Sequence, residues 1–333
     1  MKFSWRGAIG LALTVGLLWW VFHDVPWGEV QAHLRETNPW LTALAVVVGT
    51  CMFPLRARRW RPILDPIAPN LPFSPLWRST AIGMMANNIL PARAGELVRA
   101  FMLSRLTPVP FSASFASLVV DRAFDAVVVL LLMVLAMFDP RFPADATIAG
   151  RPASHVAGSG LLLVVVLATA LYAIVFFPDR LITLYELFAR RVAPRFEERG
   201  RVMLRSFAEG LSVLRHPLRF LSVLWWAVLH WLVQAIAFYI MFIAVGVDAP
   251  FSAALFVQGV IVIGVALPST PGYFGLFEAA AKASLMLYGV SDSLAVAWAV
   301  IYHILSLIPI TVFGLYYLAR TGLKLGELRQ INR

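Results

Sequence analysis

The polar residues best placed to do chemistry interrupt an apolar region between positions 265 and 282, which reads VALPSTPGYFGLFEAAAK. Pro268 and Pro271 each remove a backbone donor and clash with the preceding turn, so an uninterrupted helix is excluded. Inside a membrane, irregular backbone persists only where protein or a water-filled cavity satisfies it. The break therefore predicts a binding site, with these candidate residues: Ser269, Thr270, Gly272 and Glu278, supported by Lys282.

A second polar interruption lies between positions 87 and 99, which read NNILPARAGELVR. A half-helix that begins at such a break points unpaired amides and the positive end of its dipole into the protein, which is a ready anion site. Arginines beside it would strengthen the attraction for a phosphate headgroup. The candidates are Arg93, Glu96 and Arg99, with Asn87 and Asn88 satisfying backbone groups freed at the break.

Each of these assignments has a structural alternative. Ser269 could simply cap the half-helix that follows it. Glu278 and Lys282 are four residues apart, and Glu96 and Arg99 are three apart, so each pair could neutralise itself on one helix face. Charges within a membrane are costly and usually mark a pathway, and we therefore favour a functional role for Glu278.

A third group of charges lies inside a long apolar run. Asp121 and Asp125 share one helix face, and Arg122 is one step round the helix. The two carboxylates could bind a metal or relay protons, or they could dock against Arg93 or Arg99. His230 and His303 are isolated histidines in apolar segments. Such histidines more often form a hydrogen bond in the protein interior than bind a ligand.

The composition identifies the class of protein. Of 333 residues, 60% are hydrophobic and only 14% are charged, which is too apolar for a soluble domain. The single cysteine, Cys51, allows neither a disulfide nor a cysteine metal site. The net charge of +10 comes from arginines in loops between apolar runs, so we read it as membrane topology. No nucleotide-binding, zinc-protease or serine-hydrolase motif is present, and we predict no catalytic residue, metal or cofactor.

The predicted architecture is an all-α polytopic membrane protein with about six full spans. The apolar runs place these spans at 7–22, 40–55, 111–138, 157–177, 220–245 and 293–318. The segment between the first two spans reads as a mixed-charge loop. Arg56, Arg58, Arg59 and Arg61 follow the second span, and the positive-inside rule places them, and both termini, in the cytoplasm.

The two interrupted segments are predicted to be re-entrant helical hairpins that enter from opposite sides. The first breaks at 91–95 and the second at 268–272. The order span, span, hairpin, span then occurs twice with opposite orientation, in residues 1–138 and 157–319 of a single domain, 1–333. This is an inverted repeat of the kind found in secondary transporters. A connector at 179–219, rich in arginine, is predicted to form amphipathic helices on an anionic inner leaflet.

Four motifs together resemble the lysylphosphatidylglycerol synthase transmembrane family, also called the UPF0104 or flippase-like family. They are RARRW at 56–60, NNILPARAGE at 87–96, DRAFD at 121–125 and PSTPGYFGLFE at 268–278. The resemblance covers nearly the whole chain, and the last motif is the most specific. Bifunctional members join this region to a soluble aminoacyl transferase domain. This sequence ends at Arg333, so we expect that domain to be absent. The resemblance therefore implies lipid translocation and argues against lysyl transfer.

The sequence thus predicts a translocase in the bacterial inner membrane that moves a lipid with an anionic or modified headgroup between leaflets. Its partners would be a membrane phospholipid or lipid-linked substrate, the anionic inner leaflet, and a separate lipid synthase or glycosyltransferase. Two alternatives remain open. One is a membrane-embedded transferase acting on a lipid headgroup or polyprenyl phosphate, with Asp121 or Glu278 as base, and the other is a transporter for a small soluble anion.

Overall fold

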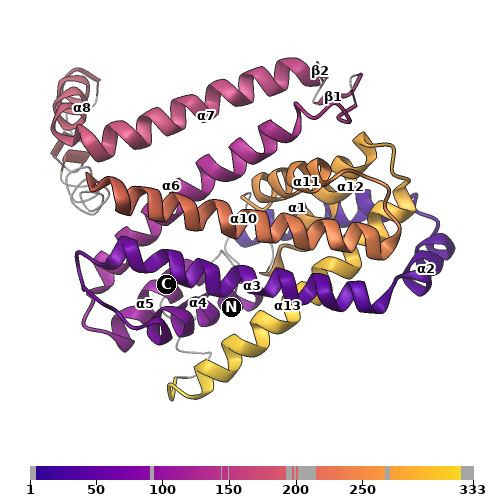
Figure 1. Cartoon of the computed structure of the whole chain (residues 1–333), viewed down its shortest axis with the longest axis horizontal. Helices are drawn as coiled ribbons and strands as arrows, with labels where there is room; N and C mark the ends of the chain where they lie inside the picture. The colour runs from indigo at the N-terminus through magenta and orange to yellow at the C-terminus, as the bar shows by residue number, and fades with distance from the viewer. Residues whose placement is uncertain are drawn as a thin grey trace.

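The computed structural model describes residues 5–90, 94–143, 145–148, 150–192, 197–198, 200–201, 215–266 and 271–323. Nearly all of this part of the chain is helical (Figure 1). The first half consists of α1 (Trp5–Phe22), α2 (Trp27–Glu36), α3 (Pro39–Leu64), α4 (Phe73–Ile89), α5 (Gly95–Leu106) and α6 (Phe111–Ala136).

A short antiparallel pair of strands follows, β1 (Thr147–Ile148) and β2 (Arg151–Pro152), in the Pro- and Gly-rich loop. The second half then consists of α7 (Ala153–Phe176), α8 (Pro178–Val192), α10 (Pro217–Val245), α11 (Phe251–Gly264), the single turn η4 (Pro271–Tyr273), α12 (Leu276–Leu287) and α13 (Asp292–Ala319). Except for α3, the bounds of the predicted spans are matched within about four residues.

Two predictions about the first half are wrong. The segment read as a mixed-charge loop contains α2, which has Glu29 in its first turn and Arg35 in its last, as the helix dipole favours. Its Val30 is buried against the core. The helix α3 does not end near residue 55 but continues to Leu64, so the arginines that we placed in a loop lie on a helix.

The membrane class rests on helix length and composition. In the described part of the chain, four helical segments are long and apolar enough to cross a membrane: Pro39–Leu64, Ala153–Ala173, Pro217–Val245 and Asp292–Ala319. With few strands and a bundle of apolar helices, the protein is an all-α membrane protein.

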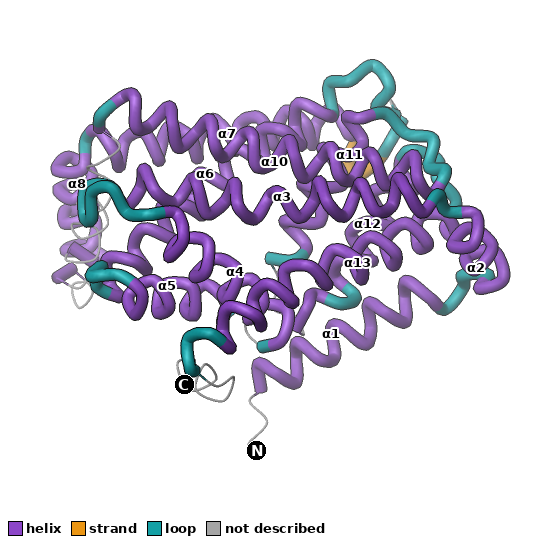
Figure 2. Tube along the Cα trace, turned by 60° about the horizontal axis from the view of Figure 1, so that its bottom comes forward, coloured by secondary structure: helices purple, strands orange, loops and turns teal. Residues whose placement is uncertain are grey.

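Long helices α3 and α10 pack against each other along the centre of the molecule. The α4–α5 pair lies toward one end of this central pair, and the α11–α12 pair lies toward the other end (Figures 1 and 2). Helix α13 crosses to pack on α4, and α6 packs on α11. One core cluster is formed mainly by α10, α11, α12 and α13, and another by α3, α6 and α10. Each helix pair is therefore held by elements of the other half of the chain.

The chain is tightly packed where each helix pair turns. A Cβ on Gly83 of α4 would lie 2.7 Å from the carbonyl oxygen of Gly95, so α4 and α5 approach more closely than larger residues would permit. In the second pair, Gly272 and Gly275 have φ values of 73° and 84°, which residues with a Cβ rarely adopt. Glycine thus permits the close approach of α4 to α5 and the backbone turn that precedes α12.

Candidate functional site

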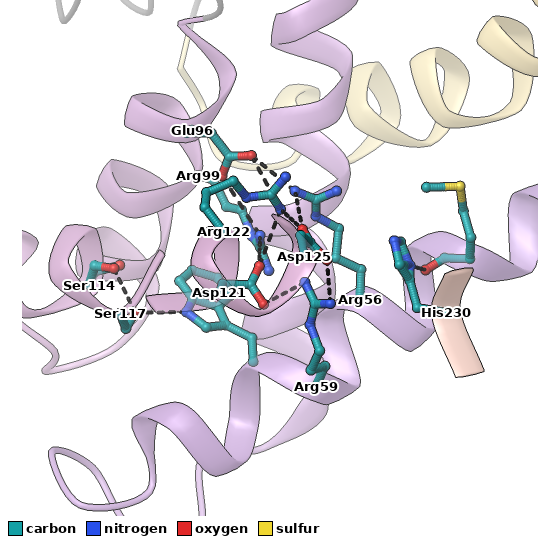
Figure 3. A network of polar contacts seen from close by, with 12 residues as sticks. Arg56, Arg59, Glu96, Arg99, Ser114, Ser117, Asp121, Arg122, Asp125 and His230 are labelled. Atoms are coloured by element: carbon teal, nitrogen blue, oxygen red, sulfur yellow. Dashed lines mark hydrogen bonds and ion pairs between the residues drawn. The ribbon is translucent and has the colours of Figure 1, made fainter. Parts of the chain in front are cut away.

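Helices α3, α5 and α6 bring seven charged side chains into one buried network (Figure 3). Its members are four arginines and three carboxylates: Arg56, Arg59, Arg99, Arg122, Glu96, Asp121 and Asp125. The set has one excess positive charge. Since an unbalanced charge buried in a protein interior is costly, an anion would be favoured beside the network.

Arg59 is the centre of this network. Its guanidinium lies 2.6 Å from Asp121 Oδ1 and 2.5 Å from Asp125 Oδ1, and it is fully buried. The two aspartates are four residues apart on α6, so both carboxylates face α3. Buried charges are compatible with a stable fold only when each is paired. Removal of one partner leaves an uncompensated buried charge and destabilises the protein.

Arg99 joins α5 to the same carboxylates. Its Nη1 donates to Asp121 Oδ2 at 3.2 Å, and its guanidinium lies 4.1 Å from the centre of the Trp60 ring. Arg99 is fully buried, so a role in direct headgroup binding is less favoured than the docking role that the sequence left open. Glu96, in contrast, receives a hydrogen bond of 3.1 Å from Arg56 and is partly exposed.

The network has one accessible edge. The side chain of Arg122 is 40% exposed and that of Glu96 is 25% exposed, whereas Arg59, Arg99 and Asp121 are at 0%. Arg122 Nη2 lies 2.9 Å from Asp125 Oδ2. A headgroup that approached the network would therefore meet Arg122 first.

Neutral donors complete the network. Trp60 Nε1 donates to Ser117 Oγ at 2.8 Å, and Trp231 Nε1 of α10 donates to Asp125 Oδ1 at 2.9 Å. His230, beside Trp231, has its Nδ1 3.3 Å from the carbonyl oxygen of Met52. The Trp231 contact restrains the Asp125 carboxylate and attaches the network to the second half of the chain.

A second polar centre lies on α12 and α13. Glu278 Oε1 is 2.6 Å from His303 Nδ1, and Glu278 Oε2 accepts a hydrogen bond of 2.7 Å from the Gly275 amide. The His303 ring stacks on Phe277, with 4.2 Å between ring centres. Both members of this Glu278–His303 pair are buried, so the protein interior contains a carboxyl group and an imidazole within proton-transfer distance.

Lys282 does not neutralise Glu278. Its Nζ lies 2.9 Å from Asp292 Oδ2 at the start of α13 and 3.3 Å from the carbonyl oxygen of Val21. It also lies 5.3 Å from the centre of the Trp20 ring. Lys282 therefore ties α12 to α1 and α13.

The described residues that flank the two breaks, at the end of α4 and in η4, lie close together. Asn87 Oδ1 accepts a hydrogen bond from the Gly95 amide at 2.9 Å, across the first break. Asn88 Nδ2 donates to Thr311 Oγ1 of α13 at 2.9 Å. A Cβ on Gly272 would lie 3.7 Å from the Asn88 carbonyl oxygen, and η4 contacts α4. The predicted site residues Arg93, Ser269 and Thr270 lie outside the described residues.

No group of three or more metal-ligating side chains occurs within the described ranges. Asp121 and Asp125, which could have formed a metal pair, are instead each held by arginines. The sequence interpretation missed Arg56 and Arg59 because it took them as topology signals. Their spacing of three residues, with Trp60 next, places all three on one helix face, and that pattern could have indicated a buried role.

Comparison with known proteins places the chain in context. A "UPF0104 membrane protein" of Methanothermobacter thermautotrophicus is 26% identical over 339 residues, covering 97% of both chains. A "UPF0104 membrane protein" of Pyrococcus horikoshii is 24% identical and covers 92% of this chain and 93% of its own. The "Glycosyltransferase AglD" of Haloferax volcanii is 35% identical over 116 residues, which are 35% of this chain but 19% of that protein.

The family model described as "Lysylphosphatidylglycerol synthase TM region" matches residues 7–314. That match includes α3, both broken helix pairs and the two polar centres. The chain belongs to the lysylphosphatidylglycerol synthase transmembrane-region family of membrane proteins.

Proposed function

We propose that this protein moves a lipid with an anionic or modified headgroup between the two leaflets of the cell's cytoplasmic membrane. The observation that carries the proposal is the buried network of four arginines and three carboxylates with an accessible edge at Arg122 and Glu96. A headgroup would be attracted by the excess positive charge while its acyl chains remain in lipid. The Glu278–His303 pair would form the rest of the path.

The path would be built by an inverted repeat of six spans and two re-entrant hairpins, α4–α5 and α11–α12. The contact pattern supports this arrangement, because α13 packs on the first hairpin as α6 packs on the second. Likewise, α3 contacts α13 and α10 contacts α6. Such repeats commonly place broken helices at the membrane midplane, where a substrate can reach them from either side.

Cysteine labelling tests this topology. In a chain with the exposed Cys51 replaced by serine, Ser74→Cys in the first turn of α4 and Ser104→Cys near the end of α5 should react from the cytoplasmic side. Asp248→Cys, in the turn before α11, should react from the opposite side. Labelling of Ser104→Cys from outside would mean that α4–α5 crosses the membrane and that the repeat does not exist.

Arg122 is expected to contact the headgroup. Arg122→Ala should lower the translocation rate by about tenfold or more, since a charged hydrogen bond contributes about 1.5–3 kcal/mol. Arg122→Lys should retain part of the rate, because it keeps the charge but loses the planar fork. The control is Arg141→Ala, whose side chain is exposed in the loop after α6 and should leave transport unchanged. Equal rates for Arg122→Ala and this control would exclude the role.

A leaflet-exposure assay tests the function itself. The purified chain is reconstituted into vesicles that contain phosphatidylglycerol with a fluorescent acyl chain, and a membrane-impermeant quencher is added outside. Without translocation, about half the fluorescence remains protected, and with translocation the protected fraction disappears. Phosphatidylcholine with the same acyl chain reports headgroup selectivity. Protection equal to that in protein-free vesicles for every anionic lipid tested would contradict the proposal.

A lipid headgroup transferase is the second candidate, because one relative is named a glycosyltransferase. The match covers 19% of that relative, so most of the named protein lies outside the matched region. In this alternative Asp121 or Glu278 would act as base. Asp121 is held by Arg59 and Arg99, which favours a structural role. Transfer of label from an activated sugar or aminoacyl donor to lipid by the purified chain would establish the transferase. For a translocase, a separate synthase would supply the lipid.

A further inference from the structure

A second positively charged site lies away from the buried network, where α4 begins and α5 and α13 end. It is a cavity of about 380 Å³, and the residues lining it that matter here are Arg78, Ser104, Arg105, Tyr317, Arg320 and Thr321. None of them belongs to the buried network or to the Glu278–His303 pair. The site therefore needs an explanation of its own.

The three arginines of this cavity are held by aromatic rings. The guanidinium of Arg78 lies 5.9 Å from the centre of the Tyr317 ring, and that of Arg320 lies 4.6 Å from the Tyr316 ring. Arg105 lies 5.9 Å from the Phe101 ring. Among the ion pairs between described residues, none includes any of the three arginines. Stacking on a ring orients a guanidinium and leaves its N–H edge available for an anion.

The hydroxyls of Ser104 and Thr321 do not compete as donors, and the Tyr317 hydroxyl accepts a hydrogen bond of 3.0 Å from Trp77 Nε1. Ser104 Oγ donates to the Phe101 carbonyl oxygen at 2.8 Å, and Thr321 Oγ1 donates to the Leu318 carbonyl oxygen at 2.7 Å. Recognition therefore falls to the arginine forks, whose geometry matches two oxygens of a phosphate group. The ligand chemistry is that of a phosphate ester or free phosphate.

An apolar stripe on α13 distinguishes a lipid from a soluble ion. Exposed apolar side chains recur every fourth residue in a row that is inclined to the helix axis and leads to Arg320: Ile304, Ile308, Val312 and Tyr316. At a rise of about 1.5 Å per residue, the sixteen-residue step from Ile304 to Arg320 is roughly 24 Å long. One leaflet of hydrocarbon is about half of a 30 Å core, so the stripe is long enough to line an acyl chain.

We infer that this cavity binds an anionic phospholipid, with its phosphate held by Arg78, Arg105 and Arg320 and an acyl chain on the α13 stripe. The lipid would bridge the first helix pair to α13, which pack together at this end. The site is separate from the proposed path and does not depend on transport. A protein that fails to move lipid could still bind lipid here.

Native mass spectrometry of the full purified chain with phosphatidylglycerol tests the inference. The triple variant Arg78→Gln, Arg105→Gln and Arg320→Gln should bind the most tightly held phosphatidylglycerol at least about tenfold more weakly, because it loses charged hydrogen bonds. The control replaces three exposed arginines elsewhere, Arg35→Gln, Arg141→Gln and Arg151→Gln, and should bind as the wild type does. A triple lysine variant should bind with intermediate strength.

Two further arms identify the ligand. Phosphatidylcholine should bind more weakly than phosphatidylglycerol, because its positive choline opposes the arginines. Ile308→Ser with Val312→Ser should weaken lipid binding, and an excess of inorganic phosphate should displace the lipid only in part. The inference would be overturned if the cavity and control variants lost the same phosphatidylglycerol affinity, or if both lipids bound equally. It would also be overturned if phosphate displaced the lipid fully and the variant of the α13 stripe bound lipid as the wild type does.

Discussion

Glu278→Gln is expected to reduce lipid translocation at least about tenfold while leaving the fold intact. Glutamine keeps the shape of the side chain, and its carbonyl oxygen can still accept from the Gly275 amide. Its NH2 group can donate to a neutral His303, so the contact between α12 and α13 is retained. What is lost is the charge and the proton-carrying capacity, which are the properties that a headgroup contact or a coupled proton requires. The leaflet-exposure assay measures the rate, and size-exclusion chromatography and thermal unfolding report the fold.

The matched control removes the neighbouring pair on the same helices. Lys282→Met with Asp292→Asn deletes both charges of that pair and should transport at close to the wild-type rate. Lys282→Met added to Glu278→Gln should not restore transport, because Lys282 bonds to Asp292 and Val21 and not to Glu278. A well-folded, transport-competent Glu278→Gln Lys282→Met double variant would show that Glu278 only balances charge.

Asp121→Asn is expected to cause the largest loss of stability. Asp121 faces Arg59 at 2.6 Å and Arg99 at 3.2 Å, both fully buried, and neutralising it leaves the network with two excess positive charges. Breaking a buried pair by removing one partner costs about 3–5 kcal/mol. We therefore expect the yield of folded protein to fall and the free energy of unfolding in a detergent titration to drop by about this amount.

Arg58→Gln serves as the control for this variant. Arg58 lies on α3 next to Arg59 but is exposed, so its loss should change stability by less than about 1 kcal/mol. Arg59→Met combined with Asp121→Leu removes one charge of each sign and should recover part of the lost stability. An Asp121→Asn variant as stable as Arg58→Gln would mean that the network does not hold α3, α5 and α6 together.

The helices of this protein could be predicted from the sequence because apolar run length, proline and glycine fix them locally. The predicted segment 111–138 and the observed α6 differ by two residues, and the second break contains Gly272 and Gly275 in conformations that glycine favours. Helix α2 was missed because it is short and mostly polar. Only Val30 is buried against tertiary neighbours that the sequence does not reveal.

The buried network could be predicted only in part. Two aspartates four apart on an apolar segment indicated a buried pair, but their partners are far away in the chain. Arg59 reaches Asp125 across 66 residues, and Trp231 reaches it across 106. The positive-inside rule already accounted for Arg56 and Arg59 as cytoplasmic residues, so their burial was not predicted. The pairing of Glu278 with His303 was missed in the same way, because the nearer Lys282 offered a plausible partner.

Headgroup photocrosslinking tests the central claim most directly. The wild-type chain is reconstituted with phosphatidylglycerol that has a photoreactive group on its glycerol headgroup, irradiated, and digested for mass spectrometry. The proposed path predicts crosslinks near its entrance at Glu96 and Arg122 and near Glu278, and it predicts that Arg122→Ala reduces those at the entrance. Crosslinks confined to the arginine cavity and the lipid-facing surfaces, with none at these two polar centres, would contradict the account.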